Sequence, residues 1–421
     1  MTAPVNKTVL SNGIRVLTKS LPQVRSVSMG VWVDVGARDE SPEESGLSHF
    51  IEHMIFKGTR RRSAYQIAKE FDAIGGQTNA FTTMESTCYH AKVLDAHLDT
   101  MVDILADIFL HSVFDRQEVE RERPVIFQEI GMLEDNPEEY IHLLAGKAYW
   151  GDAPLGASIL GSRENITRFT AENIVSFFKK YYQPERIVIS AAGHLDHVDF
   201  VDKVAAPFES VQPGDGLPPR IAPRGRQELA LHGRSLEQVH ICLTTGGVSI
   251  TDPRRYPMAL MNTILGGNMS SRLFQEIRER RGLAYSVYSF ISSFVDTGMF
   301  GAYVGVDPKN TRTVVELLLT HLRQLASAPV SQSELTDAKE FTKGNLLLSA
   351  ESVDNQMVRI AQNEIHFGRN IPMGEVVSAV DSVTSEEIQV LARSILAENP
   401  MALTLLGPVS EQDVPGEILE S

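Results

Sequence analysis

The sequence has little cysteine, no long apolar run and no excess of basic residues, and each absence excludes a class of protein. Only two cysteines, Cys88 and Cys242, occur among 421 residues. A disulfide framework is therefore excluded, and both are expected at buried strand positions. No run reaches the ~18–20 apolar residues that span a bilayer. The net charge of −15 argues against nucleic-acid binding, which needs concentrated basic surface.

The first residues of the chain also lack the features of a targeting segment. The stretch MTAPVNKTVLSNGIRVL has no charged start followed by an apolar core, as a signal peptide would. It also lacks the Arg- and Ser-rich amphipathic pattern of a transit peptide. We therefore expect a cytoplasmic protein, while a mitochondrial matrix protein whose leader has been removed would have the same N-terminus.

What the sequence does contain is enough material for two domains. A chain of 421 residues, of which 43% are hydrophobic, exceeds what a single core usually holds. The stretch 210–227 is rich in Pro and Gly, which predicts a linker between domains at 1–209 and 228–421. A weak internal match between 166–193 and 380–407 indicates duplication. Each of these segments has a Thr that can cap a helix and ends with an apolar strand and a Gly.

Helical and strand-like patterns alternate along both halves. Residues 27–35 alternate apolar with other residues, which predicts a half-buried strand whose second face carries Ser28 and Trp32. Residues 78–93 form another strand-like run, and helical patterns occur near 95–110 and elsewhere. We expect each half to be an α+β unit in which helices pack on a sheet.

The segment 46–59 predicts a helix that carries His49, Glu52 and His53 in the order H-x-x-E-H. The two histidines lie one turn apart on one face, so both imidazoles can reach a single metal ion. Glu52 projects beside the same place, where a carboxylate can accept a proton from water. An amphipathic helix with two half-exposed histidines would show the same spacing, so the motif alone leaves both interpretations open.

A third ligand is expected because catalytic zinc usually has three protein ligands. In the helical segment 115–134, Glu122 and Glu129 lie two turns apart and share a face. Apolar neighbours would draw Glu129 inward, where a carboxylate needs a partner such as a metal ion. Pro124 removes one backbone hydrogen bond and can kink the helix before Glu129. By periodicity alone, solvated acids on a charged helix are the favoured interpretation.

The residues HFIEHMIFKGT, followed by Glu129 in ERERPVIFQEI, resemble the pitrilysin (insulinase) superfamily of zinc peptidases. The resemblance covers nearly the whole chain and is closest to the short-chain branch that includes the mitochondrial processing peptidase β subunit and its bacterial relatives. It implies one zinc ion per chain, held by His49, His53 and Glu129. It also implies that Glu52 is the general base and that Glu122 is a supporting acid. By the same resemblance, two homologous domains with mainly antiparallel sheets form a clam-like chamber around an extended peptide.

The segment GGQTNAFT at 75–82 resembles the edge strand that binds substrate in this family. The resemblance implies that an extended peptide adds to this strand through main-chain hydrogen bonds at Asn79, Ala80 and Phe81. An ordinary strand that begins at a glycine would have the same pattern.

In the second half, SRLFQEIRERRGLAYS at 271–286 resembles the Arg/Tyr pair of the family. The resemblance implies that Arg278 and Tyr285 are catalytic residues that reach the substrate near the zinc. A charged helix followed by an ordinary strand tyrosine would look the same. The counterpart of the histidine helix, MALMNTILGG at 258–267, has no His or Glu, so only the first half is expected to bind metal.

The expected function is that of a zinc metalloendopeptidase acting on short or unfolded peptides. Because one chain carries both the zinc set and the Arg/Tyr pair, and because the loop at 266–268 is short, we expect a self-sufficient homodimer in the bacterial cytoplasm. A cluster of acids after Glu129 fits basic, presequence-like substrates, or is simply a solvated loop: Glu134, Asp135, Glu138 and Glu139. The alternative is a catalytically silent structural subunit of the same family, and such subunits typically lose part of the zinc set.

Overall fold

The computed structural model describes residues 4–214, 216, 218–410 and 413–414. Its contacts divide the chain into two compact units. Unit 1 comprises the chain up to Gly131, Ser158–Pro219 and Leu348–Asn370, and unit 2 comprises Met132–Ala157, Arg220–Leu347 and the chain from Ile371 onward. The boundary at which the chain passes from unit 1 to unit 2, between Pro219 and Arg220, falls inside the predicted linker 210–227. Two segments, 132–157 and 348–370, depart from a simple division at that linker, since each joins the unit built mainly from the other half of the sequence.

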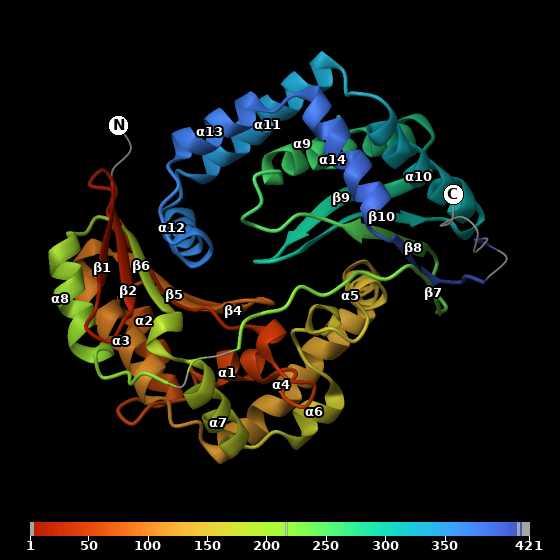
Figure 1. Ribbon diagram of the computed structural model, residues 1–421. Helices are drawn as coiled ribbons and strands as arrows, with labels where there is room; N and C mark the ends of the chain where they lie inside the picture. The colour runs from red at the N-terminus through yellow and green to blue at the C-terminus, as the bar shows by residue number, and fades with distance from the viewer. Residues whose placement is uncertain (1–3, 215, 217, 411–412, 415–421) are drawn as a thin grey trace. The chain divides into compact units, whose positions relative to one another are not determined.

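Unit 1 contains a six-stranded sheet in the order β1-β2-β6-β3-β5-β4 (Figure 1). Every neighbouring pair is antiparallel except β2 and β6. The strands are β1 Val5–Val9, β2 Arg15–Ser20, β3 Ser26–Val33, β4 Gln77–Thr82, β5 Thr87–Leu94 and β6 Ile187–Gly193.

Unit 2 contains a five-stranded sheet in the order β7-β11-β8-β10-β9, in which only β7 and β11 are parallel. The strands are β7 Glu228–Gly233, β8 Val239–Gly246, β9 Ala284–Ser293, β10 Gly298–Val306 and β11 Ala402–Gly407. This order repeats that of β2-β6-β3-β5-β4, with the parallel pair at the same place. The predicted α+β class, with two helix-packed and mainly antiparallel sheets, is therefore confirmed.

The repeat also includes the two segments that match in sequence. Thr170 and Thr384 are the N-cap residues of helices α7 (Ala171–Tyr181) and α14 (Ser385–Glu398), and each forms a reciprocal capping box. The strands β6 and β11 follow these helices and end at Gly193 and Gly407, both with positive φ. A Cβ at either glycine would meet backbone atoms of a neighbouring strand, so glycine is required at both.

One face of the first sheet carries the main core of unit 1. Helices α1, α3 and α8 pack on it, and side chains of β3 such as Val27, Met29 and Val31 are fully buried beneath them. The helices of this unit that lie in the first half of the sequence are α1 Leu47–Met54, α2 Ala64–Ala73, α3 Leu98–His111, α4 Arg116–Asp135, α6 Arg163–Arg168, α7 and α8 His197–Phe208, of which α4 continues into unit 2.

The other face of this sheet is covered by α12 (Val353–Phe367), a helix from the second half of the sequence (Figure 1). Met357 and Ile360 pack there against Trp32 in a separate apolar cluster. The prediction of a half-buried strand at 27–35 is therefore wrong, because Ser28 and Trp32 are fully buried as well. The sequence pattern of this strand could not reveal its cover, which is supplied by residues far along the chain.

In unit 2, too, one face of the sheet is covered by a helix from the other half of the sequence. Helices α9, α10 and α14 pack on one side of its sheet, while α5, from the first half of the sequence, contacts β7, β8 and β11. Ile141 and Ala145 of α5 are buried with Cys242 and Tyr303. The helices are α5 Pro137–Trp150, α9 Arg255–Leu265, α10 Thr311–Ser327, α11 Gln332–Ser349, α13 Met373–Ser382 and α14.

Three further expectations can be compared with the structure. The strand-like run at 78–93 is two strands, β4 and β5, because a turn closed by the Thr83 N–H and the Ser86 carbonyl interrupts it. Helix α4 is continuous through Pro124. Cys88 and Cys242 are buried free thiols on strands, as expected. Within the described residues, no helix is both long and apolar enough to cross a bilayer.

Candidate metal centre

Helix α1 is held at its N-terminus by a buried carboxyl group. Glu40 accepts the backbone N–H groups of Gly46 and Ser48 at 2.7 and 2.6 Å, two groups that have no partner within the helix. Gly46 has φ +102, a conformation that favours glycine. Burial raises the pKa of Glu40 to about 8. These contacts anchor the turn that carries the first histidine.

The structure brings His49, His53 and Glu129 together, from helices α1 and α4 of unit 1. The two Nε2 atoms lie 3.2 Å apart. Glu129 Oε2 lies 3.4 Å from each of them. In the described part of the chain, these three residues form the group of His, Cys and acidic side chains that could hold a metal ion.

The donor set fits a zinc ion. Ligands bound at ~2.0–2.1 Å in tetrahedral geometry lie about 3.3 Å from one another, close to the separations of 3.2 and 3.4 Å. Burial and the neighbouring His53 lower the pKa of His49 to about 3, which keeps its imidazole in the neutral form that binds metals. Two histidines and one glutamate leave a fourth position open, as in catalytic rather than structural zinc sites.

Glu52 lies beside this group on the same helix and is half-buried. The Thr82 hydroxyl donates a hydrogen bond to Glu52 Oε2 at 2.6 Å. Burial raises the pKa of the Glu52 carboxyl above its ordinary value, while the Thr82 hydroxyl acts in the opposite direction. A carboxylate placed in this way can act as a general base near neutral pH.

Glu122, the predicted supporting acid, contacts the second histidine. Its Oε1 lies 3.0 Å from His53 Nδ1, and its Oε2 lies 2.6 Å from Lys57 Nζ. Glu122 is buried, on the same helix as Glu129. A carboxylate at Nδ1 orients the ring and directs Nε2 toward a metal, an arrangement common among metal-binding histidines.

The predicted peptide-binding residues lie on a sheet edge. Strand β4 pairs only with β5 in the described sheet and leaves its other edge free. Asn79 is exposed, and its Oδ1 accepts the Ala80 N–H at 2.9 Å. Phe81 packs edge-on against Trp32, with ring centres 5.5 Å apart. Because α1 packs beside β4, this edge lies next to the histidine helix within unit 1.

Arg278 and Tyr285 are neighbours in unit 2. Arg278 Nη1 donates to the Tyr285 carbonyl at 2.9 Å, and the guanidinium lies 4.3 Å from the centre of the Tyr285 ring. Tyr285 is 76% exposed, so its ring and hydroxyl are accessible. Arg278 belongs to a π-helical turn, Phe274–Arg280, and such turns are frequent at functional sites.

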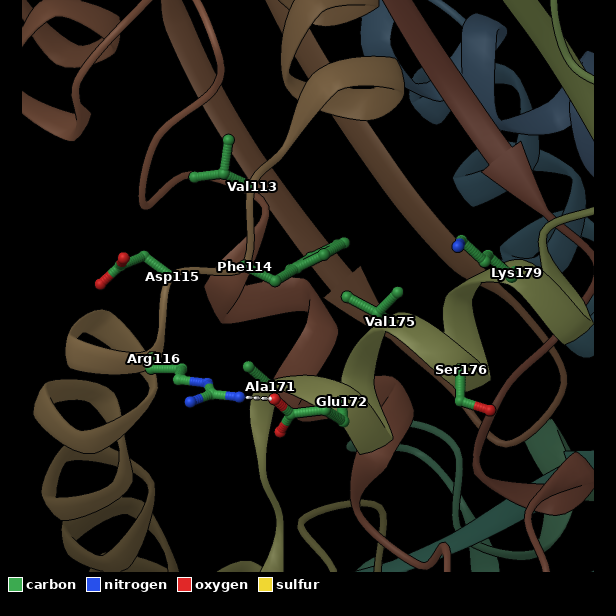
Figure 2. Close-up of a pocket in the computed structure, with 9 residues that line it drawn as sticks. All are labelled: Val113, Phe114, Asp115, Arg116, Ala171, Glu172, Val175, Ser176 and Lys179. Atoms are coloured by element: carbon green, nitrogen blue, oxygen red, sulfur yellow. Dashed lines mark hydrogen bonds and ion pairs between the residues drawn. The ribbon is translucent and has the colours of Figure 1, made fainter.

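A cavity of about 570 Å³ elsewhere in unit 1 contains none of the predicted site residues. Figure 2 shows that it is lined by residues near the start of α4 and along α7, with an ion pair between Arg116 and Glu172 at its rim. Its lining includes the aliphatic side chains of Val113, Ala171 and Val175. Neither a His, Cys and acid cluster nor a buried charge lies in its lining, so it does not compete with the histidine site.

Comparisons with known proteins indicate a family of peptidases. The family model described as "Insulinase (Peptidase family M16)" matches residues 15–163, and that described as "Peptidase M16 inactive domain" matches residues 168–341. A protein named as an uncharacterized zinc protease in Bacillus subtilis is 40% identical, with 96% of this chain and 98% of that protein covered. A protein of the same description in Streptomyces coelicolor is 39% identical, with 97% and 90% covered.

Two solved structures share the fold at low sequence identity. A protease from Helicobacter pylori has a TM-score of 0.90 at 20% identity, covering 96% of this chain and 100% of that one. A structure from Pseudomonas fluorescens described as a peptidase M16 inactive domain has a TM-score of 0.89 at 19% identity, covering 97% and 98%. The chain belongs to the insulinase family of peptidases, family M16, which confirms the resemblance found in the sequence.

Three residues at the site were not singled out by the sequence: Glu40, Lys57 and Thr82. Thr82 ends the strand motif, and alternation from Ala80 could have placed it on the side of the sheet where α1 packs. Lys57 stands inside the histidine motif, but no periodicity indicates its partner. Glu40 is separated from α1 by a loop. It can accept the N–H groups at the start of α1 only because that loop folds back, which no local pattern indicates.

Proposed function

We propose that the protein is a zinc-dependent endopeptidase that hydrolyses short or unfolded peptides. One observation carries this proposal: the donor atoms of His49, His53 and Glu129 are spaced as the ligands of a tetrahedral zinc ion, with the Glu52 carboxyl beside them. The relatives in Bacillus subtilis and Streptomyces coelicolor, which are named as zinc proteases, support it. His49, His53 and Glu129 would hold the metal.

The chemistry needs a nucleophile and a proton carrier. Zinc, when bound, lowers the pKa of water toward ~7 and polarises a carbonyl group. Glu52 accepts the proton of the attacking water and then delivers it to the leaving amine, so one residue serves as base and acid in turn. Glu122 keeps His53 in the orientation in which Nε2 faces the other donors.

The peptide would bind in extended form along β4. A free strand edge offers N–H and C=O groups that can pair with any sequence, which suits an enzyme acting on unfolded chains. The Asn79 side chain, which accepts the Ala80 N–H, would have to release that group for pairing. By family resemblance, Arg278 and Tyr285 would contact the substrate backbone or the developing oxyanion.

The substrate preference, the quaternary state and the location of the protein remain predictions. The acids after Glu129 would favour basic, presequence-like peptides, and cleavage of otherwise identical basic and acidic peptides tests this. A homodimer is expected and can be measured by light scattering. The relatives are bacterial proteins, and the cytoplasmic location is a prediction that cell fractionation can test.

The decisive experiment measures zinc content together with cleavage of a quenched fluorescent basic peptide. Glu52→Gln should retain about one zinc per chain and lose at least about 10³-fold in kcat, because the base is gone while the ligands remain. Glu43→Gln, an exposed glutamate just before α1, is the matched control and should behave as wild type. Zinc-free wild-type protein without peptidase activity would favour the catalytically silent structural subunit instead, and full activity in Glu52→Gln would refute the role of Glu52 as general base.

A further inference from the structure

Lys57 lies just beyond the end of α1 and contacts the buried side of the histidine site. Its backbone N–H bonds the Met54 carbonyl at 3.0 Å, which continues the turn after the helix. Its side chain reaches Glu122, with Nζ 2.6 Å from Oε2, and is 31% exposed. The ammonium group therefore lies between solvent and a carboxylate that is only 7% exposed.

Both carboxylate oxygens of Glu122 have a partner. Oε2 accepts from Lys57, and Oε1 faces His53 Nδ1 at 3.0 Å. A carboxylate removed from water is costly unless charge and hydrogen bonds compensate it. Lys57 supplies the charge and fixes one oxygen, which leaves the other aimed at the imidazole.

The two histidines differ in this respect. His49 Nδ1 is buried and has no hydrogen-bond partner among the described residues. His53 Nδ1, by contrast, has the Glu122 carboxylate. A carboxylate acceptor at Nδ1 selects the tautomer whose Nε2 carries the lone pair. Of the two histidines, only His53 therefore has a side-chain partner at Nδ1 among the described residues. That partner, Glu122, is in turn bonded to Lys57.

We propose that Lys57 is a positioning residue for the metal site, acting through Glu122 on His53. The chain Lys57–Glu122–His53 holds the imidazole in the orientation and tautomer that bind zinc, so Lys57 sets zinc affinity without touching the ion. The inference rests on the proposed function, since it requires zinc at His49, His53 and Glu129. It adds to that function a determinant of how tightly the enzyme keeps its metal.

The test is the zinc dissociation constant of the full chain, measured by competition with a chromogenic chelator. Lys57→Met, similar in length but uncharged, should weaken zinc binding about 10-fold, the lower end of the range for loss of a ligand's own hydrogen-bond partner, because Lys57 acts one contact further out. Lys57→Gln serves as a second neutral variant, and Lys57→Arg should bind zinc within about threefold of wild type, because the charge is kept. Lys69→Met, at an exposed lysine of α2, is the matched control and should leave the constant unchanged.

A double-mutant cycle separates this role from a general loss of stability. If Lys57 acts through Glu122, then Lys57→Met should add nothing to the effect of Glu122→Gln. Independent, multiplying effects would overturn the inference, as would an unchanged constant in Lys57→Met. An altered KM at saturating zinc would also overturn it, since it would make Lys57 a substrate contact.

The same measurements distinguish failure of the inference from failure of the proposed function. Failure of wild-type protein to bind zinc would refute both. Wild-type zinc binding with an unchanged zinc dissociation constant in Lys57→Met would refute the inference alone.

Discussion

The Thr82 hydroxyl donates a hydrogen bond of 2.6 Å to Glu52 Oε2. This contact joins the last residue of the edge strand β4 to the residue proposed as general base. Because a carboxylate bonded at one oxygen has less freedom to rotate, the contact holds the other oxygen in place for proton transfer. The same strand would bind the peptide, so β4 would position both the general base and the substrate.

Replacing Thr82 should therefore impair turnover rather than binding. We expect Thr82→Val to lower kcat about tenfold or more while zinc content and KM stay close to wild type, because only proton transfer loses its support. Thr82→Ser restores the hydroxyl and should restore most of the rate. Steady-state kinetics on one quenched peptide would measure this, with Thr167→Val, an exposed threonine of α6, as the control. Equal rates in Thr82→Val and wild type would contradict the role given to this contact.

Removal of Glu129, the third proposed ligand, should be visible as loss of metal. Glu129→Gln leaves two histidines at the site, and a catalytic zinc held by two residues binds far more weakly than one held by three. The zinc content after dialysis, measured by mass spectrometry, should fall well below one per chain. Glu120→Gln, an exposed acid on the same helix, should retain the metal. A full zinc complement in Glu129→Gln would remove this residue from the ligand set.

The buried Glu40 should make the stability of the protein depend on pH. Burial raises its pKa to about 8 from an ordinary value of 4.5, so the folded protein binds this proton more tightly than the unfolded chain does. The free energy of unfolding therefore falls as pH rises from about 4.5 to about 8, by up to ~1.4 kcal/mol per pH unit for one group.

Urea denaturation at pH 6 and pH 8 would measure this dependence. Glu40→Gln cannot ionise, so the difference in unfolding free energy between the two pH values should be smaller than in wild type. It should also be less stable at pH 6 by about 1 kcal/mol, because a single carbonyl oxygen replaces two acceptors at Gly46 and Ser48. Identical pH dependence in the two proteins would show that Glu40 titrates normally.

Helix α12 should contribute to the stability of unit 1 although it lies far in sequence from the rest of that unit. Met357 is fully buried against Trp32 and its neighbours. We expect Met357→Ala to lower the free energy of unfolding by about 2–4 kcal/mol, the usual result of a large-to-small change in a core. Met132→Ala removes the same atoms from a side chain that is 71% exposed and should change stability by less than ~0.5 kcal/mol. Similar effects of the two changes would argue against packing of α12 on this sheet.

Local patterns were sufficient for the class of fold and for the principal motif. Alternation at 27–35 predicted a strand, and the match between 166–193 and 380–407 indicated a repeat that the order of strands in both sheets reproduces. His49 and His53 could be paired from spacing alone, because a helix sets the distance between residues one turn apart. Family resemblance, rather than periodicity, singled out Glu129.

The tertiary structure decided which residues distant in sequence are in contact, and no local pattern contains this information. Residues 353–367 bury the second face of β3, so a strand that looked half-exposed is buried on both sides. Lys57 and Thr82 acquire their roles only because Glu122 and Glu52 lie within hydrogen-bond distance. The sequence by itself determined most of the helices and strands and the pairing of His49 with His53 on one helix face, because these depend on neighbours along the chain. Which side chains meet was decided by the fold, because charge compensation and burial depend on residues that are distant in sequence.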